Sequence, residues 1–247
     1  MAAELDIVVP VYNEGANIIG VLQSLVAHVR TSFRVLICYD HDDDDTLTAI
    51  AAHGDWPIEI LPVKNRGRGA FGAVTSGFAA SRAPYVLVFP ADDDYNAPRI
   101  DSLVARARDG ADIVVASRFI PGGCMVGCPW LKSAMVRSSA FALHTFARLP
   151  AHDASNGLRL FSQRTLRSIP LESTEGFTYS IELLVKAHRL GWRIDEVPIH
   201  WYQRKAGQSR FRVIQWAPAY LHWFFYAFET TWLRRGPQSV VVTSSPD

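Results

Sequence analysis

Three consecutive carboxylates, Asp92 to Asp94, follow directly after an apolar run that ends at Phe89. Side chains alternate in extended backbone, so we expect Asp92 and Asp94 to point the same way and Asp93 to point away. Two carboxylates held side by side repel each other, and a divalent cation makes such an arrangement favourable. Because Mg²⁺ and Mn²⁺ take oxygen ligands, often carboxylates together with substrate phosphates, Asp92 and Asp94 are the predicted metal ligands.

The alternative for an aspartate triplet is a solvated acidic turn. Its position after a buried-looking strand favours a site instead, because open α/β sheets bind ligands at the carboxyl ends of their strands. The elements around the triplet therefore decide between these two interpretations.

Short apolar runs alternate with helical patterns through the first 117 residues. The runs are typical of buried parallel strands and lie at 5–11, 33–39, 58–62, 85–89 and 113–117. Between them, apolar spacing predicts an amphipathic helix over 18–29, capped by Asn17, and crossover helices at 69–80 and 98–108. This alternation predicts an α/β fold with a doubly wound, mostly parallel sheet.

After residue 118 the alternation changes. A glycine-rich loop leads to an expected helix over 130–149, a strand near 157–161, a helix over 179–190 and an extended segment over 193–201. No internal repeat or low-complexity linker separates these elements from the first half.

Composition narrows the class of protein. The chain has 247 residues, 49% of them apolar, and a formal net charge of +1. These values disfavour both disorder and general nucleic-acid binding. Its first residues lack the basic flank and apolar core of a signal peptide. The three cysteines fit a reducing compartment, and the pair Cys124 and Cys128 has no second ligand pair nearby that would suggest zinc.

The C-terminal tail is rich in aromatic residues. Eight of them fall within residues 216–233, interrupted by His222 and Glu229 and followed by Arg234 and Arg235. A spanning helix needs roughly 20 mostly apolar residues, and aromatic side chains prefer the headgroup level of a bilayer. We therefore expect an amphipathic helix that lies in a membrane interface. The alternative is a helix that docks on the core of its own domain or on a partner subunit.

Four further segments follow predicted strands. They lie at 9–14, 40–45, 65–70 and 117–119 and carry acidic, basic and glycine residues. Because the carboxyl ends of parallel strands meet at one edge of a sheet, we expect these segments and the triplet to line one crevice.

In this order the motifs resemble the family 2 glycosyltransferases of GT-A (Rossmann-like) fold, and within them the polyprenol-phosphate (dolichol-phosphate) mannose synthase group. Pro-Val-Tyr-Asn-Glu at 10–14 is similar to the opening motif of the family, and Asn-Arg-Gly-Arg-Gly-Ala at 65–70 to its N-x-G-K-G-x-A segment. Segments 153–159, 175–198 and 204–210 are similar to later motifs of the group, D-x-x-S-G-F-R, G-[FY]-x-[FY]-x-I-E followed by G-x-x-I-x-E-V-P, and R-x-x-G-x-S-K. The resemblance covers about residues 5–212.

The resemblance implies an inverting transfer of a hexose from a nucleoside-diphosphate sugar, of GDP-mannose or UDP-glucose type, to a polyprenyl phosphate lipid. The cation at Asp92 and Asp94 would offset the charge of the leaving diphosphate. Residues implied to bind the donor are Pro10, Tyr12, Glu14, Asp40 and Arg68. Anion-binding residues implied for the acceptor half are Arg118, Arg137, Arg159, Arg204 and Arg210. The candidate catalytic residues are Asp92, Asp94, Arg118, Arg159 and Arg210.

The same resemblance suggests a catalytic domain over 1–212, with a nucleotide-sugar half to residue 118 and an acceptor half over 119–212, and a tail over 213–247. A lipid acceptor implies a cytoplasmic enzyme at the inner face of the membrane, held there by the tail or by a separate membrane protein.

Two departures from the family pattern leave the donor open. Pro90-Ala-Asp-Asp-Asp-Tyr replaces the usual D-A-D-L, and Tyr39-Asp40-His41-Asp42 replaces D-D-G-S. Two alternative functions also remain. One is transfer to a hydroxyl acceptor, which needs a carboxylate base such as Asp153 or Glu182. The other is a non-catalytic nucleotide-sugar-binding module.

Overall fold

The computed structural model describes residues 3–203 and 213–243 and is built on a seven-stranded sheet of order β3-β2-β1-β4-β7-β5-β8. The neighbouring strands pair in parallel except where β7 meets β4 and β5. The predicted α/β fold with a mostly parallel sheet is confirmed. The strands are β1 (Leu5–Pro10), β2 (Phe33–Tyr39), β3 (Glu59–Lys64), β4 (Tyr85–Val88), β5 (Ile113–Ser117), β7 (Arg159–Ser162) and β8 (Ile194–Pro198).

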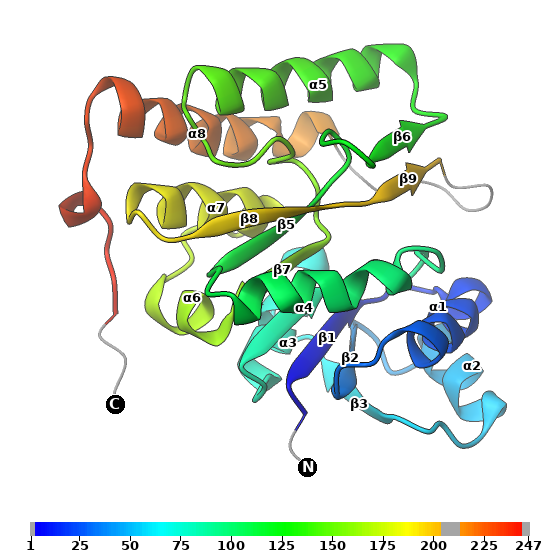
Figure 1. Ribbon diagram of the computed structural model, residues 1–247. Coiled ribbons are helices and arrows are strands. Elements are labelled where there is room, and N and C mark those ends of the chain that lie inside the picture. The colour runs from blue at the N-terminus through cyan, green and yellow to red at the C-terminus, as the bar shows by residue number, and fades with distance from the viewer. Residues whose placement is uncertain (1–2, 204–212, 244–247) are drawn as a thin grey trace.

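Helices cover both faces of this sheet (Figure 1). One face packs against α1 (Gly15–His28), α2 (Asp45–His53) and α4 (Ile100–Arg108). The other packs against α3 (Gly69–Ala80) and α7 (Thr178–Arg189). Alternation along β1 produces this division, because Ile7 and Val9 belong to the first core cluster and Val8 to the second.

Helix α3 approaches the sheet closely because a glycine faces it. A Cβ added at Gly77 would lie 2.6 Å from Val8 Cγ1 and 2.8 Å from Cys38 Sγ. Any larger residue would therefore push away the helix whose N-terminus carries the Arg68 loop.

The second half of the chain shares the sheet with the first. Strand β7 lies between β4 and β5, and a small parallel sheet joins β6 (Cys124–Val126) to β9 (His200–Tyr202). The remaining elements are α5 (Trp130–Thr145), α6 (Gln163–Ser168), α8 (Val213–Trp232) and the 3₁₀ turns η1 (Ala97–Arg99) and η2 (Pro237–Ser239).

Several sequence-based details are wrong. Helix α1 begins at Gly15, so Asn17 does not cap it, and the Asn17 amide instead donates to the Glu14 carboxylate at 2.7 Å. Strand β3 runs to Lys64 rather than residue 62. The short elements α2, β6 and α6 were not expected, because the first follows an acidic run and the others span few residues.

Helix α8 is attached to the domain by one face. Trp223 and Ala227 are buried, and the Trp223 indole N–H donates to Ser173 Oγ at 2.9 Å. Arg189 of α7 donates from Nε to Thr230 Oγ1 at 2.8 Å. One face of α8 therefore docks on the core of its own domain, which was the alternative expected for the tail. The opposite face of α8 exposes large apolar side chains. Of the helices that the structure describes, none has the length and apolar character needed to span a bilayer.

Candidate active site

The loop after β3 is folded around Asn65. Its side-chain Nδ2 donates to Asp40 Oδ1 and to the Gly69 carbonyl, and its Oδ1 accepts from the Gly67 N–H at 2.7 Å. Its backbone N–H donates to the Tyr39 carbonyl at 2.8 Å. These bonds bring Asp40, at the end of β2, beside the loop that carries Arg68. Arg68 itself is exposed at the N-terminus of α3.

The loop after β1 is held by the acidic run after β2. Asp44 accepts from the Asn13 N–H at 3.0 Å, and Asp45 accepts from the Gly15 N–H at 2.9 Å. Asn13 adopts a positive φ of 53°, a conformation that asparagine tolerates. Tyr12 is left 41% exposed, edge-on to His41. Two of the acidic residues therefore hold the loop after β1 in place.

Pro10 and Glu14 complete the donor side of this edge. Pro10 ends β1 and is half-buried, and Glu14 opens α1 with its N–H donating to Thr46 Oγ1 at 2.9 Å. The sequence-predicted residues after β1, β2 and β3 thus lie in one hydrogen-bonded group of loops at the carboxyl edge of the sheet.

The acidic loop after β4 is turned, so the extended backbone expected through the triplet is wrong. Asp93 points inward and is 6% exposed, and it accepts from the Asn96 N–H at 2.9 Å and from Asn96 Nδ2 at 2.7 Å. Asp94 is exposed and lies against α1, where Ser24 Oγ donates to its carbonyl. Asp92 is half-buried. Burial raises the pKa of Asp93 to about 6, and the hydrogen bonds from Asn96 only partly oppose this effect.

The acidic loop fits a hard cation by the chemistry of its donors. Its carboxylate oxygens suit Mg²⁺ or Mn²⁺, which commonly take one or two carboxylates and complete their shell with phosphates and water. Within residues 3–203 and 213–243, no three His, Cys, Asp or Glu side chains are grouped to hold a metal by themselves.

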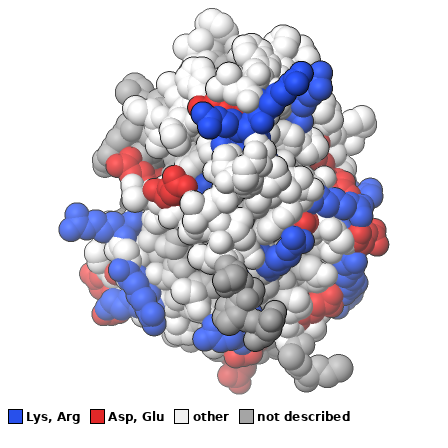
Figure 2. Space-filling model, turned by 90° about the vertical axis from the view of Figure 1, so that its left-hand side faces the viewer, with Lys and Arg blue, Asp and Glu red and all other residues white. Residues whose placement is uncertain are grey.

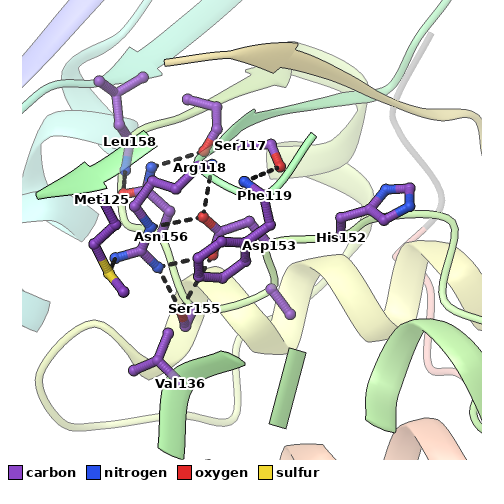
Figure 3. Close-up of polar contacts among 12 residues, drawn as sticks. Ser117, Arg118, Phe119, Met125, Val136, His152, Asp153, Ser155, Asn156 and Leu158 are labelled. Atoms are coloured by element: carbon purple, nitrogen blue, oxygen red, sulfur yellow. Dashed lines mark hydrogen bonds and ion pairs between the residues drawn. The ribbon is translucent and has the colours of Figure 1, made fainter. Parts of the chain in front are cut away.

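Arg118, after β5, is fixed by a buried carboxylate (Figure 3). Its Nε and Nη2 donate to the two oxygens of Asp153 at 2.7 and 2.8 Å, and Nη2 also donates to Ser155 Oγ at 2.7 Å. Asp153 is 0% exposed. The hydrogen bond described for Nη1 is a weak one, to Met125 Sδ at 3.8 Å. This edge of the guanidinium keeps most of its hydrogen-bonding capacity for another acceptor.

Phe119 brings a second arginine to the same place. The guanidinium carbons of Arg118 and Arg137 lie 5.1 and 4.9 Å from the centroid of its ring. Cation–π contact with the same ring favours the position of each guanidinium group. Arg137, which extends from α5, is exposed. The predicted pair Arg118 and Arg137 is therefore brought together.

Arg159 is the sequence-predicted site residue whose position disagrees with its expected role. It is 0% exposed within β7, and its Nη1 donates to the Ser180 carbonyl. Its Nη2 donates to the carbonyls of Asp153 and Ala154 at 3.4 and 3.3 Å. Burial lowers the pKa of Arg159 to about 10. This geometry corrects the expectation of an anion-binding Arg159: it supports the loop that holds Arg118. Arg204 and Arg210 lie outside the described residues.

Sequence reasoning missed the roles of two residues of this edge. Phe119 lies in the expected segment 117–119, but nothing in the sequence predicted that its ring would contact two arginines. Asn96 is 3% exposed and bridges the acidic loop to β9 through His200. No local sequence pattern predicts the contact between Asn96 and His200, because the two residues are 104 positions apart.

Comparisons with known proteins agree with this architecture. Residues 6–169 match the family model of glycosyl transferase family 2. An uncharacterized glycosyltransferase of Mycobacterium tuberculosis is 30% identical over 206 residues, covering 83% of this chain and 88% of its own length. An undecaprenyl-phosphate mannosyltransferase of Micrococcus luteus is 30% identical over 216 residues, covering 82% and 85%. A polyprenol monophosphomannose synthase of Mycolicibacterium smegmatis is 27% identical over 228 residues, covering 85% of each chain.

Solved structures show the same fold. Glucosyl-3-phosphoglycerate synthase from Mycobacterium tuberculosis, crystallised with Mn²⁺, uridine-diphosphate-glucose and phosphoglyceric acid, gives a TM-score of 0.67 at 19% identity, covering 92% of this chain and 80% of that chain. Its complex with Mg²⁺ and uridine-diphosphate gives 0.65 at 20% identity, covering 92% and 79%. The predicted GT-A type fold is confirmed, and the chain belongs to glycosyl transferase family 2 and is a glycosyltransferase.

Proposed function

We propose that this enzyme transfers a hexose, with inversion, from a nucleoside-diphosphate sugar to a polyprenyl phosphate. The printed names of two relatives, a polyprenol monophosphomannose synthase and an undecaprenyl-phosphate mannosyltransferase, support this acceptor class. Donors of GDP-mannose and UDP-glucose type both remain within the proposal, because its nucleotide-binding residues depart from the family pattern at 39–42.

The observation that carries the proposal is that both candidate catalytic bases, Asp153 and Glu182, are buried and paired with cations. A hydroxyl acceptor needs a carboxylate that can reach it and take its proton. Asp153 and Glu182 are both 0% exposed. Asp153 pairs with Arg118, and Glu182 pairs with Lys186 at 2.6 Å. Neither carboxylate is open to a substrate.

A phosphate acceptor removes the need for such a base. A phosphate monoester has a second pKa of about 6, so at neutral pH it is largely dianionic and already nucleophilic. It needs cations that hold it in place. Arg118 and Arg137 offer two guanidinium groups that contact the same Phe119 ring, and arginine matches phosphate geometry.

The residues proposed to bind the donor lie in the group of loops at the same carboxyl edge of the sheet. Pro10, Tyr12, Glu14 and Asp40 would hold the nucleoside, and Arg68 with the N-terminus of α3 would hold the diphosphate. Asp92, with Asp94, would bind Mg²⁺ or Mn²⁺, which supplies Lewis-acid stabilisation of the leaving diphosphate. Arg204 and Arg210 stay in the proposal as acceptor-binding residues.

The testing experiment compares acceptors. Transfer is measured from GDP-mannose and UDP-glucose to polyprenyl phosphate and to the free polyprenol, with and without Mn²⁺. Arg118→Ala and Arg137→Ala should each lower transfer to the lipid phosphate by about ten- to a hundredfold, since a charge-assisted contact contributes roughly 1.5–3 kcal/mol. Nucleotide binding should stay within about threefold. Robust transfer to the free alcohol, unaffected by either substitution, would contradict the phosphate acceptor.

Peripheral attachment to the inner face of the membrane is the second part of the proposal, and α5 strengthens it. Helices α5 and α8 lie side by side at the top of Figure 1, and the same end of the molecule in Figure 2 is largely uncharged. Their outer sides carry apolar residues that are each 51% to 80% exposed: Trp130, Leu131, Met135, Phe141, Leu221, Phe225, Trp232 and Leu233. A surface of this extent marks an interaction site. Its tryptophans and the neighbouring Arg234 and Arg235 suit a headgroup layer that contains anionic lipid.

Point substitutions test this better than deletion of residues 216–247, which would also remove the buried Trp223 and Ala227. Phe141→Ser on α5 and Phe225→Ser on α8 should each weaken co-sedimentation with anionic vesicles by roughly tenfold, because a large apolar side chain no longer enters the interface. Ser138→Ala, also exposed on α5, is the matched control. A change of oligomeric state with unchanged vesicle binding would instead assign the surface to a second copy of the chain.

A further inference from the structure

Asn96 ends the acidic loop and is almost wholly buried, at 3% exposed. Its Nδ2 donates to Asp93 Oδ2 at 2.7 Å and to the His200 carbonyl at 2.7 Å. Its Oδ1 accepts from the His200 N–H at 3.1 Å. Both amide hydrogens and one oxygen lone pair are therefore used, and a single side chain joins two parts of the molecule that are distant in sequence.

The amide of Asn96 engages the backbone of His200 through both its N–H and its carbonyl, as a neighbouring strand would. Tyr95 adds a second attachment, because its hydroxyl accepts from the Tyr202 N–H at 3.3 Å and the two rings meet edge-to-face at 5.1 Å. Two consecutive residues of the acidic loop thus bind both ends of β9. On its other side, the loop is held to α1 by the hydrogen bond from Ser24 Oγ to the Asp94 carbonyl.

Strand β9 leads directly into the segment that contains Arg204 and Arg210. A displacement of the acidic loop relative to the sheet must therefore either break the Asn96 bonds or carry the backbone of residues 200–202 with it. Breaking the two bonds to His200 would leave the buried Asn96 oxygen and one of its N–H donors without partners, which is unfavourable. The displacement is more favourable when the two elements move together.

We propose that Asn96 is a positioning residue that couples the acidic loop to β9. Binding of a divalent cation and nucleotide at the loop would order β9 through Asn96. The inference rests on the proposed function for the identity of the two substrates. The mechanical connection rests on the hydrogen bonds alone.

Hydrogen–deuterium exchange of the full chain tests the coupling, with Mn²⁺ alone, Mn²⁺ with GDP, and Mn²⁺ with UDP as probes. In the wild type, peptides that cover residues 199–203 should exchange more slowly once Mn²⁺ and a nucleotide are bound. In Asn96→Ala these peptides should exchange at least about tenfold faster and should not respond to the probes, because two backbone hydrogen bonds are lost. Peptides from β1 and β2 should be unchanged, which shows that the variant is folded.

Two further variants make the result specific. Asn96→Asp keeps the shape of the side chain but places carboxylate oxygens against the His200 carbonyl and Asp93, so it should lose protection at 199–203 as Asn96→Ala does. Ser24→Ala removes the other attachment of the loop, and it should leave exchange at 199–203 as in the wild type. In transfer assays, Asn96→Ala should lower the ratio of transfer to donor hydrolysis by about tenfold, a change that mere loss of stability would not produce.

The outcomes separate this inference from the proposed function. If calorimetry shows that the wild type binds Mn²⁺ and nucleotide while residues 199–203 do not respond, the coupling is wrong and the proposed donor chemistry stands. Equal exchange at 199–203 in the wild type and in both Asn96 variants would also overturn it. Failure to bind either probe would overturn the proposed function, and the coupling with it.

Discussion

Asp6, in strand β1, and Asp93, in the loop after the neighbouring strand β4, are buried aspartates at opposite edges of the sheet. Asp6 accepts from Arg34 Nε and Nη2, both at 2.9 Å, and from Ser81 Oγ at 2.8 Å, and it also accepts two backbone N–H groups. Asp93 accepts hydrogen bonds from Asn96 and the Tyr95 N–H, and its pKa is raised further by the charge of Asp92. One carboxylate is balanced by a cation, and the other lies beside more negative charge.

Their pKa values move in opposite directions. Burial alone raises the pKa of Asp6, but the hydrogen bonds from Arg34, the backbone and Ser81 outweigh it, and the pKa falls below 3.8. Burial raises the pKa of Asp93 to about 6. The amino edge of the sheet is therefore built for stability. At the carboxyl edge, burial and the charge of Asp92 both disfavour ionisation of Asp93, as expected of a functional site.

The largest effect should come from the carboxyl edge. We expect Asp92→Asn to lower transfer by about 10²–10³-fold, since the carboxylate that would hold the cation is lost. Asp94→Asn should lower transfer by a smaller factor, because Asp94 lies against α1. Initial rates at saturating donor with varied Mn²⁺ measure both. A larger loss for Asp94→Asn would show that the loop turns when the cation binds.

Asp6→Asn should affect stability instead of chemistry. Removing one partner of a buried ion pair leaves Arg34 without its counter-charge, and we expect unfolding free energy to fall by about 3 kcal/mol. Urea unfolding at neutral pH measures this loss, and nucleotide affinity at a temperature where the variant is folded should be unchanged. Reduced nucleotide affinity would contradict the assignment of this edge to stability alone.

The pH dependence of stability should have opposite signs at the two sites. Asp93 titrates near pH 6 in the folded state and near 3.8 unfolded, so the folded state binds more protons between these values and loses stability as pH rises. The loss reaches at most about 3 kcal/mol. Asp6 contributes stability above pH 3.8 that is lost as pH falls through its lowered pKa. Unfolding of the wild type, Asp93→Asn and Asp6→Asn across pH 3–7 isolates each contribution; a difference between wild type and Asp93→Asn that does not vary with pH would contradict the raised pKa.

The sequence predicted the edge better than the orientation of its side chains. Apolar runs and glycines are local signals, and they located β2, β5 and α3 at their observed bounds. The direction of Asp93 depends on Asn96 and on β9, which meet only in the folded chain. The burial of Arg159 was unpredictable for the same reason, because its partners are backbone carbonyls that no residue type reveals.

The smallest expected effects are those of substituting two acidic residues of the carboxyl edge, Asp44 and Asp42. Asp44 is 3% exposed, caps α2 through the Thr46 N–H at 2.9 Å and holds the Asn13 N–H at 3.0 Å. Asp42 is exposed and forms a surface ion pair with Lys64. We expect Asp44→Ala to cost about 1 kcal/mol, as loss of an N-cap does, and Asp42→Ala to leave the melting temperature unchanged. Nucleotide affinity should weaken in Asp44→Ala alone, because Asn13 supports the loop that carries Tyr12 and Glu14. Equal effects of the two substitutions on stability and on affinity would mean that net negative charge, and not the position of each carboxylate, determines how this edge works.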